Sequence, residues 1–496
     1  MFTPRVPWAI DSNGFGPDGR PGWMVMLAAM RVLLVSHRFP PHSAAGTEVY
    51  TAELARRLQA RGHEVHVFSS QKDTGRDDLT LERRSHAGVP VTEVINNLYH
   101  ESFEQTWQHP GVDAVFREEM QRIDPEVIHF QHLMYLSVGC LEIARKSGAA
   151  VLMTLHDFWL ECPRMGQLVH ADGELCDTVE FERCGTCLPS FTWTQSATAR
   201  RAGQSLAGLR RATGLDLSPL ARKIHKKISR PPGSHADVDP ETRESFAVSA
   251  SGRTDALRQR TVAAVQRFLA PSRFLRERFV RWGLDPESIH YTPTGLDPLG
   301  VGAVSAPASE GAFEVLFLGS FIPIKGAHVL LDAWGRLDSA LRTKAHLRLH
   351  GPVFQDADYA AELERQARTV GAEVGEGLDR AGVQAALARA DLLVVPSLWF
   401  ENRPLVLMEA MGAGVPVVVT RLGGMAELVE EGVNGWTFPM GDAAALAAVL
   451  SERVRTGPES MAAVSAEALG FPTWEEATDQ VLEHYAACLA SRGSAG

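Results

Sequence analysis

Two carboxylates, Glu401 and Glu409, stand eight residues apart in the most informative segment of the chain, residues 396–410. The pattern predicts a strand end, a loop and a helix that opens at Pro404, because proline suits the first helical position. A helix N-terminus offers free backbone N–H groups and a positive dipole end to an anion such as pyrophosphate. Glu409, about one and a half turns inside that helix, can accept hydrogen bonds from sugar or ribose hydroxyls. The segment combines an anion cradle with two hydroxyl acceptors, which suits a nucleotide sugar.

The elements that must position these residues are short apolar strands alternating with amphipathic helices. In the first half we expect strands at 31–36, 64–69, 127–130 and 151–155, and helices at 48–60 and 138–146. In the second half we expect strands at 314–318, 346–350, 391–395 and 416–420, and a helix at 327–337. Uninterrupted Val, Ile and Leu strands that alternate with helices indicate parallel sheets covered on both faces. The predicted fold class is α/β, with two doubly wound, Rossmann-like domains.

The segment resembles the Glu-x7-Glu motif of the family-4 retaining glycosyltransferases, enzymes of the GT-B fold. Residues 401–404 read Glu-Asn-x-Pro, and residues 409–417 read Glu-Ala-x-x-x-Gly-x-Pro-Val. Further landmarks are Ala-Pro-Ser at 270–272 and the turn at 294–297, where Thr294 departs from the usual asparagine. The resemblance covers nearly everything from Met30 to the C-terminus, apart from about residues 190–260. It implies two domains that face a central cleft.

This resemblance and the composition predict the division of the chain. Residues 1–29 lack periodicity and are expected to be a disordered extension. The acceptor-side domain is expected at 30–297, the linker at 298–311, the nucleotide-sugar domain at 312–471, and a helix returning to the first domain at 472–496. The linker is rich in Gly, Ala, Ser and Pro, as flexible connections are.

The resemblance carries donor-binding roles onto the second domain. Residues 319–326 are similar to a Gly-Arg-x-x-x-x-Lys-Gly loop, so Lys325 would place its charge on the pyrophosphate. Ser320 replaces the usual arginine, and Arg403 is a candidate substitute for the missing charge. The implied donor-binding set is Gly46, Ser320, Lys325, Asn402, Arg403, Pro404, Leu405 and Glu409, and the implied catalytic set is His156, Glu401 and Lys325.

Two of these residues belong to the first domain. Gly46 lies in a loop similar to Gly-Gly-x-Glu, with Ala45 in place of the first glycine, and would let backbone approach the donor. A simple turn is the other interpretation of this loop. His156 follows the strand expected at 151–155, at the edge where doubly wound domains bind ligands. The family places a histidine there beside the donor sugar, although a lone histidine can also be purely structural.

Four of the six cysteines form a separate signal at Cys162, Cys176, Cys184 and Cys187. The final Cys-x-x-Cys is typical of a structural tetrahedral zinc site. Disulfides are the alternative, which a reducing compartment would disfavour. Asp237 and Asp239 match the letters of a metal-binding Asp-x-Asp pair, but no strand precedes them. We therefore expect structural zinc and no cofactor for catalysis.

The net charge of −11 argues against nucleic acid as the main partner. Within the insertion at about 190–260, residues 200–230 carry nine Arg or Lys against one acid, with leucines interleaved. Attraction to anionic lipid or to a lipid-diphosphate acceptor is one interpretation, and a solvated helical hairpin is the other. We expect a cytoplasmic location, with peripheral contact at the inner face of the membrane as an option.

The leading hypothesis is a retaining, metal-independent glycosyltransferase that moves a sugar from a nucleoside diphosphate donor to a hydroxyl acceptor. The acceptor is a sugar, a lipid-linked group or a small molecule, as in polysaccharide, glycolipid or glycosylated-metabolite synthesis. No carboxylate is evidently placed as a nucleophile, so the family's front-face route is expected. The alternatives are a non-catalytic sugar-nucleotide-binding or assembly subunit, suggested by Ser320 and Thr294, and a GT-B sugar-nucleotide epimerase.

Overall fold

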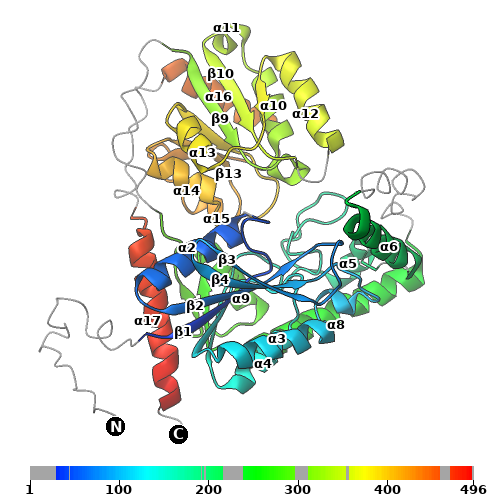
Figure 1. The fold of residues 1–496 in the computed structure, drawn as a ribbon. Helices are drawn as coiled ribbons and strands as arrows, with labels where there is room; N and C mark the ends of the chain where they lie inside the picture. The colour runs from blue at the N-terminus through cyan, green and yellow to red at the C-terminus, as the bar shows by residue number, and fades with distance from the viewer. Residues whose placement is uncertain are drawn as a thin grey trace, which may run out of the picture.

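The computed structural model describes residues 29–43, 45–191, 193–194, 197–215, 238–296, 311–353, 357–457 and 470–493. Two α/β domains stand one above the other, with the chain's last helix running alongside the first domain (Figure 1). The expected extension at 1–29, except its last residue, and the expected linker at 298–311, except its last residue, lie outside the described residues. Residues 216–237, which include the second half of the basic segment at 200–230, also lie outside them.

The N-terminal domain is built on an eight-stranded sheet with the order β3-β4-β2-β1-β5-β6-β7-β8. Its strands are β1 (Arg31–Val35), β2 (Glu64–Gln71), β3 (Leu81–His86), β4 (Val89–Ile95), β5 (Val127–Phe130), β6 (Ala150–Thr154), β7 (Arg267–Ala270) and β8 (Ile289–Tyr291). Only the β3–β4 pair within this sheet is antiparallel. In β1, Leu33 and Val35 pack into one core and Val32 and Leu34 into the other, so the sheet is buried on both faces.

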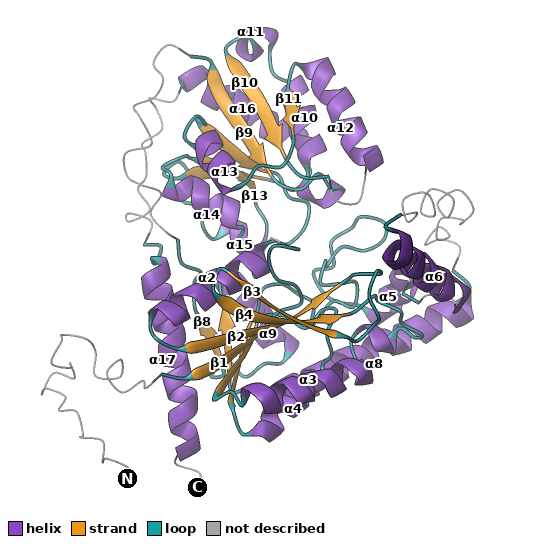
Figure 2. Cartoon of the chain, in the orientation of Figure 1, coloured by secondary structure: helices purple, strands orange, loops and turns teal. Residues whose placement is uncertain are grey.

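Helices lie on both faces of this sheet (Figure 2). The helices of this domain are α2 (Gly46–Ala60), α3 (Pro110–Ile123), α4 (Gly139–Ser147), α5 (Phe181–Cys187), α6 (Ala197–Thr213), α8 (Pro240–Ala264) and α9 (Arg273–Trp282), of which α5 packs mainly on α8. The 25-residue helix α8 occupies much of the region for which sequence predicted no element. Its N-cap is Asp239, whose side chain accepts from the Thr242 amide, so this carboxylate of the Asp-x-Asp pair caps a helix.

The C-terminal domain has a fully parallel six-stranded sheet with the order β11-β10-β9-β12-β13-β14. Its strands are β9 (Phe313–Leu318), β10 (Ala345–His350), β11 (Glu373–Gly375), β12 (Leu392–Val395), β13 (Val417–Thr420) and β14 (Gly435–Phe438). Its helices are α10 (Ala327–Gly335), α11 (Ser339–Arg342), α12 (Ala357–Val370), α13 (Arg380–Leu387), α14 (Leu405–Gly412), α15 (Gly423–Ala426) and α16 (Ala443–Thr456). The predicted α/β class with two doubly wound sheets is confirmed.

The last helix, α17 (Trp474–Gly493), packs against the N-terminal domain. Tyr485 is fully buried, and its hydroxyl lies 2.8 Å from Nδ1 of His129 in β5. Arg61, just after α2, donates to Asp479 at 2.8 Å. The end of the chain therefore contributes to the core of the first domain. None of the helices in the described ranges is long and apolar enough to cross a membrane.

Candidate functional site

The C-terminal sheet reverses its strand order between β9 and β12, because β10 lies on the far side of β9 and β13 on the far side of β12. Doubly wound sheets bind ligands in the crevice beyond the carboxyl ends of the strands at such a switch point. The two loops that leave these ends contact each other, since the Leu398 amide donates to the Ile324 carbonyl at 2.8 Å. Gly326 has a φ of 72°, and a Cβ there would collide with the Pro396 carbonyl. Only glycine permits this approach.

The structure brings Lys325 and Glu401 together at the switch point. Lys325 Nζ lies 2.5 Å from Glu401 Oε1, and it also sits 5.1 Å from the centre of the Trp399 ring. The same Oε1 accepts from Trp399 Nε1 at 2.7 Å and from Ser397 Oγ at 3.0 Å. Glu401 is only 9% exposed. Three donors on one oxygen fix the carboxylate and hold the lysine charge at the carboxyl ends of β9 and β12.

Helix α14 begins beside this pair. It starts at Leu405, one residue later than predicted, with Pro404 as its N-cap. The first N–H groups of a helix have no partner within it, and here they belong to Leu405 and Val406. Glu409 lies partly buried on the same helix. Burial raises the pKa of the Glu409 carboxyl, and Arg380 of α13 opposes that shift. Ser320 lies partly buried in the loop after β9, where its carbonyl accepts from the Ile322 amide.

Residues on either side of Glu401 reach the other domain. Phe400 stacks on Phe274 with ring centres 5.4 Å apart. Asn402 accepts from Ser272 Oγ at 2.5 Å and donates to the Leu155 and His156 carbonyls at 3.4 and 3.3 Å. The loops after β6 and β12 therefore meet, so the carboxyl edges of the two sheets face each other. The Asn402 side chain is engaged in this domain contact.

Arg403 is 8% exposed and also lies at the contact between the domains. Its Nη1 donates to the Pro271 carbonyl at 3.3 Å and to the Tyr291 hydroxyl at 3.2 Å, while its guanidinium covers the Phe471 ring at 5.0 Å. Its Nε lies 3.1 Å from Met408 Sδ. These partners do not include Lys325 or Glu401, so the structure does not bring Arg403 to the pair.

His156 follows β6 and belongs to a buried polar cluster of the N-terminal domain. Its Nε2 lies 2.9 Å from Gln131 Oε1, and its ring packs edge-on against Tyr50 at 4.9 Å. Burial, aided by the neighbouring His132, lowers the pKa of His156 to about 3. The imidazole is therefore neutral at pH 7. His132 Nε2 lies 3.0 Å from Asp157 Oδ2, which anchors the loop that carries His156.

Sequence reasoning missed several members of this cluster. His37 follows β1, with Nε2 3.3 Å from Glu48 Oε1, and its ring centre is 4.5 Å from that of His132. The strands β1 and β5 that end here are neighbours at the order reversal of this sheet. Polar residues directly after two predicted strands were the available signal. Gly46 opens α2 nearby in the chain, and a Cβ added to it would meet nothing within 4 Å.

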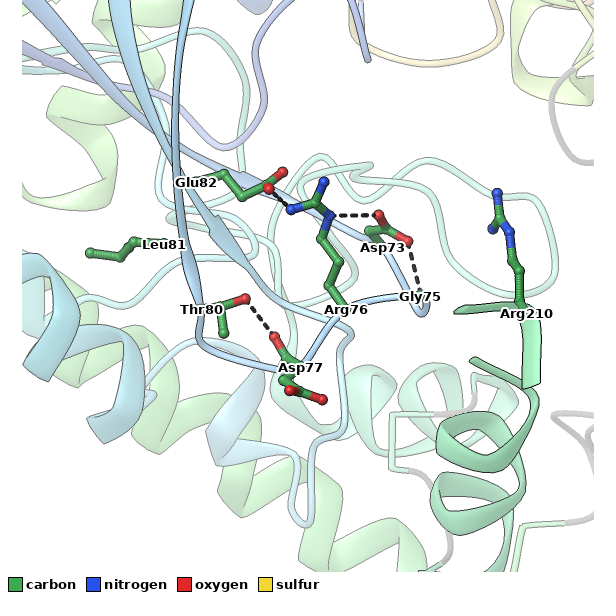
Figure 3. Close-up of a pocket in the computed structure, with 8 residues that line it drawn as sticks. All are labelled: Asp73, Gly75, Arg76, Asp77, Thr80, Leu81, Glu82 and Arg210. Atoms are coloured by element: carbon green, nitrogen blue, oxygen red, sulfur yellow. Dashed lines mark hydrogen bonds and ion pairs between the residues drawn. The ribbon is translucent and has the colours of Figure 1, made fainter. Parts of the chain in front are cut away.

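The N-terminal domain also carries a cavity of about 580 Å³ between the loop after β2 and helix α6 (Figure 3). Arg76 lies at its centre, 3.3 Å from Asp73 and paired with Glu82. Arg210 of α6 and Asp77 complete the charged lining. Since β2 is the neighbour of β1, this cavity opens from the same edge of the sheet as the polar cluster.

The four clustered cysteines all line one cavity of about 20 Å³. All six cysteines of the chain are free thiols, so the structure contains none of the alternative disulfides. Burial, together with the neighbouring Cys162, Cys187 and Cys176, raises the pKa of Cys184 to about 12. Within the described ranges, no group of three or more His, Cys, Asp or Glu is arranged to hold a metal ion. Cys140 and Cys488 are buried elsewhere.

Comparisons with known proteins agree with this architecture. Residues 44–175 match the family described as Glycosyltransferase Family 4, and residues 312–455 match Glycosyl transferases group 1. Among solved structures, the chain is similar to Anabaena HepE in complex with UDP and glucose, with a TM-score of 0.55 and 17% identity over 92% of this chain and 99% of that one. Sucrose-phosphate synthase from Thermosynechococcus elongatus gives 0.59 and 17% over 93% and 99%. Two facing doubly wound domains of this kind define the GT-B fold.

Curated relatives support a family assignment. The chain is 34% identical over 184 residues to the phosphatidyl-myo-inositol mannosyltransferase of Mycobacterium leprae, a match to 36% of this chain and 48% of the relative. It is 29% identical over 213 residues to the amylovoran biosynthesis glycosyltransferase AmsK of Erwinia amylovora, covering 38% and 48%. The chain spans about half the length of the curated relatives it matches. The chain belongs to family 4 of the glycosyltransferases, as the resemblance predicted.

Proposed function

We propose that this chain transfers a sugar from a nucleoside diphosphate sugar to a hydroxyl acceptor, with retention of anomeric configuration and without a metal ion. The observation that carries the proposal is the pair of Lys325 and Glu401, 2.5 Å apart at the switch point and next to the start of α14. The cation and the helix N-terminus suit the diphosphate of such a donor, and the fixed carboxylate suits its sugar.

The nucleotide half of the donor lies on the C-terminal domain in this proposal. Lys325 and the amides of Leu405 and Val406 contact the diphosphate, where a fixed positive charge and backbone donors stabilise the departing phosphate. Glu409, deeper on α14, accepts hydrogen bonds from the ribose hydroxyls. Because these groups supply the positive charge and the backbone donors that the proposal needs at the diphosphate, no step is assigned to a metal ion.

The sugar half lies between the domains. Glu401 is held through Oε1, which leaves Oε2 as the acceptor for sugar hydroxyls. From the facing domain, His156 contributes a neutral imidazole. With Nε2 donating to Gln131 Oε1, its Nδ1 can accept a hydrogen bond from a sugar hydroxyl. Gly46, at the start of α2, has no side chain and therefore lets the donor approach the backbone. These contacts position the sugar, and positioning plus charge stabilisation is the catalysis we propose.

The acceptor lies on the N-terminal domain in this proposal. The charged cavity around Arg76 has carboxylates that accept from hydroxyls and guanidinium groups that donate to them. The relatives from Mycobacterium leprae and Erwinia amylovora are named for a phosphatidyl-myo-inositol mannosyltransferase and for amylovoran biosynthesis. We carry over from these names only a hydroxyl acceptor in polysaccharide or glycolipid synthesis. Peripheral membrane contact through the basic segment at 200–230 stays a prediction.

The proposal is tested by screening UDP-, GDP- and ADP-sugars for stabilisation and then for turnover. A donor at a hundred times its dissociation constant stabilises the protein by about 2.7 kcal/mol. We expect donors with one of these three nucleotides to raise the melting temperature. Transfer of the sugar should then release the corresponding nucleoside diphosphate. Proton NMR of the product should give the donor's anomeric configuration. Binding without any release of nucleoside diphosphate would instead support the non-catalytic binder, and an inverted product would contradict retention.

A further inference from the structure

Four thiols from three separate elements converge on one small enclosed space beside the loop that carries His156. The turn after β6, the hairpin closed by the Val169–Leu175 bridge and helix α5 each contribute. The thiols belong to Cys162, Cys176, Cys184 and Cys187. The last two are three residues apart on α5, so they project from the same side of the helix. Residues up to 25 positions apart in the chain are thus folded around one point.

The size of this space limits what can fill it. Its volume of about 20 Å³ is close to that of a single water molecule or ion. A buried water needs two to four polar partners, and Arg164, His170 and Arg183 line the same space. What favours a metal ion over a water here is the set of four sulfur atoms. A four-iron cluster with its sulfides needs far more room. A single soft-ligand cation is the occupant that both the volume and the sulfur atoms suit, since four thiolates favour tetrahedral zinc.

We propose that Cys162, Cys176, Cys184 and Cys187 bind one structural zinc ion through four thiolates. Binding forms four Zn–S bonds and releases the four thiol protons to solvent. In the present arrangement the four thiols, like every other such group in the described ranges, are not positioned to hold a metal ion. The side chains must therefore rotate inward to reach the roughly 2.3 Å of a Zn–S bond. No covalent bond prevents this, because none of the four is in a disulfide.

The zinc site would brace the contact between the domains, which takes this inference beyond donor binding. Glu161, next to Cys162, forms a buried pair with Arg278 at 2.7 and 2.9 Å. The same guanidinium reaches the Cys176 carbonyl at 3.4 Å and covers the Phe400 ring at 5.2 Å. Phe400 precedes Glu401. A rigid cysteine segment therefore holds one wall of the proposed sugar site without touching the sugar.

The test measures metal in the full-length protein after removal of any affinity tag. Plasma mass spectrometry should find about one zinc per chain and no matching iron. Cys184→Ser and Cys187→Ser should each lose most of that zinc. Cys140→Ser is the matched control, because Cys140 is fully buried in the same domain but does not line this cavity. It should keep its zinc.

X-ray absorption on the unmodified protein keeps the proposal testable if the serine variants fail to fold. Four sulfur neighbours near 2.3 Å would support it. Wild-type protein without zinc, zinc bound equally by the Cys184→Ser variant, iron in place of zinc, or a disulfide between any two of the four cysteines would each overturn it. Zinc content does not depend on donor binding, so failure here leaves the proposed function standing, and failure of donor binding leaves the zinc site standing.

Discussion

Replacing Lys325 by methionine should separate recognition of the phosphates from recognition of the nucleoside. Methionine keeps the length of the side chain and its packing over Trp399, but removes the charge that lies 2.5 Å from Glu401. A hydrogen bond to a charged group contributes about 1.5–3 kcal/mol. We therefore expect nucleoside diphosphate affinity to fall roughly 10- to 150-fold. Affinity for the bare nucleoside should stay within a factor of two or so.

Titration calorimetry with nucleoside, nucleoside diphosphate and donor sugar checks this directly. Lys344→Met is the matched control, because Lys344 is exposed just before β10, at the opposite edge of the same sheet. It should bind all three ligands as wild type does. Glu401→Gln should leave nucleoside diphosphate binding nearly intact and mainly slow turnover, since its partner is the sugar. Equal diphosphate affinity in wild type and Lys325→Met would refute the assignment of this lysine.

Three further predictions follow from the site. Burial raises the pKa of Glu409, and ribose hydroxyls bind its charged form, so nucleoside affinity should fall as the pH drops through that raised pKa. Calorimetry across pH should show no such fall in Glu409→Gln. Identical pH profiles for wild type and Glu409→Gln would remove the ribose role. Gly46→Ala adds a methyl group that meets nothing in the protein, so the melting temperature should be unchanged while donor affinity drops; unchanged affinity would place the donor elsewhere. Arg403→Met should destabilise the protein by about 1–3 kcal/mol, because the Tyr291 hydroxyl and the Pro271 carbonyl lose a buried donor; denaturant unfolding measures this, and a loss of diphosphate affinity would restore the phosphate role that the sequence suggested.

The central strands β1, β9, β12 and β13 could be predicted because each is a largely apolar run. Residues 417–420 are fully buried, and their limits agree with the sequence to within one residue. The β3–β4 hairpin was missed because β3 reads Leu-Glu-Arg-Arg-Ser-His and lies half-exposed at the edge of the sheet. Charged residues commonly prevent such an edge strand from pairing with another chain. They also interrupt the alternation of apolar residues by which a strand is predicted from sequence.

Helix α8 was missed for a different reason. Its 25 residues are mostly small or polar and present no strong apolar stripe. The usable signal was local: Asp239 followed by Pro240 is a standard helix start, with an N-cap and a proline at the first helical position. The two aspartates were considered only as a metal-binding pair, which was rejected, so the helix start was not recognised.

The donor side of the site was accessible to sequence because its residues fall in two short loops. The polar cluster around His156 was only partly found, since His37, His132 and Asp157 come from three loops that only the sheet order brings together. The direction of the Arg403 side chain could not be read from the chain at all. It depends on Tyr291, more than a hundred residues away.

The central claim is that the nucleotide half of a donor occupies the switch point of the C-terminal domain. A crystal structure with the nucleoside diphosphate selected by the stabilisation screen tests it most directly. We predict the diphosphate within hydrogen-bond distance of Lys325 Nζ and of the first amides of α14, with the ribose hydroxyls on Glu409. A nucleotide bound at the His37–His132 end of the N-terminal sheet, with Lys325 still paired only to Glu401, would contradict the account.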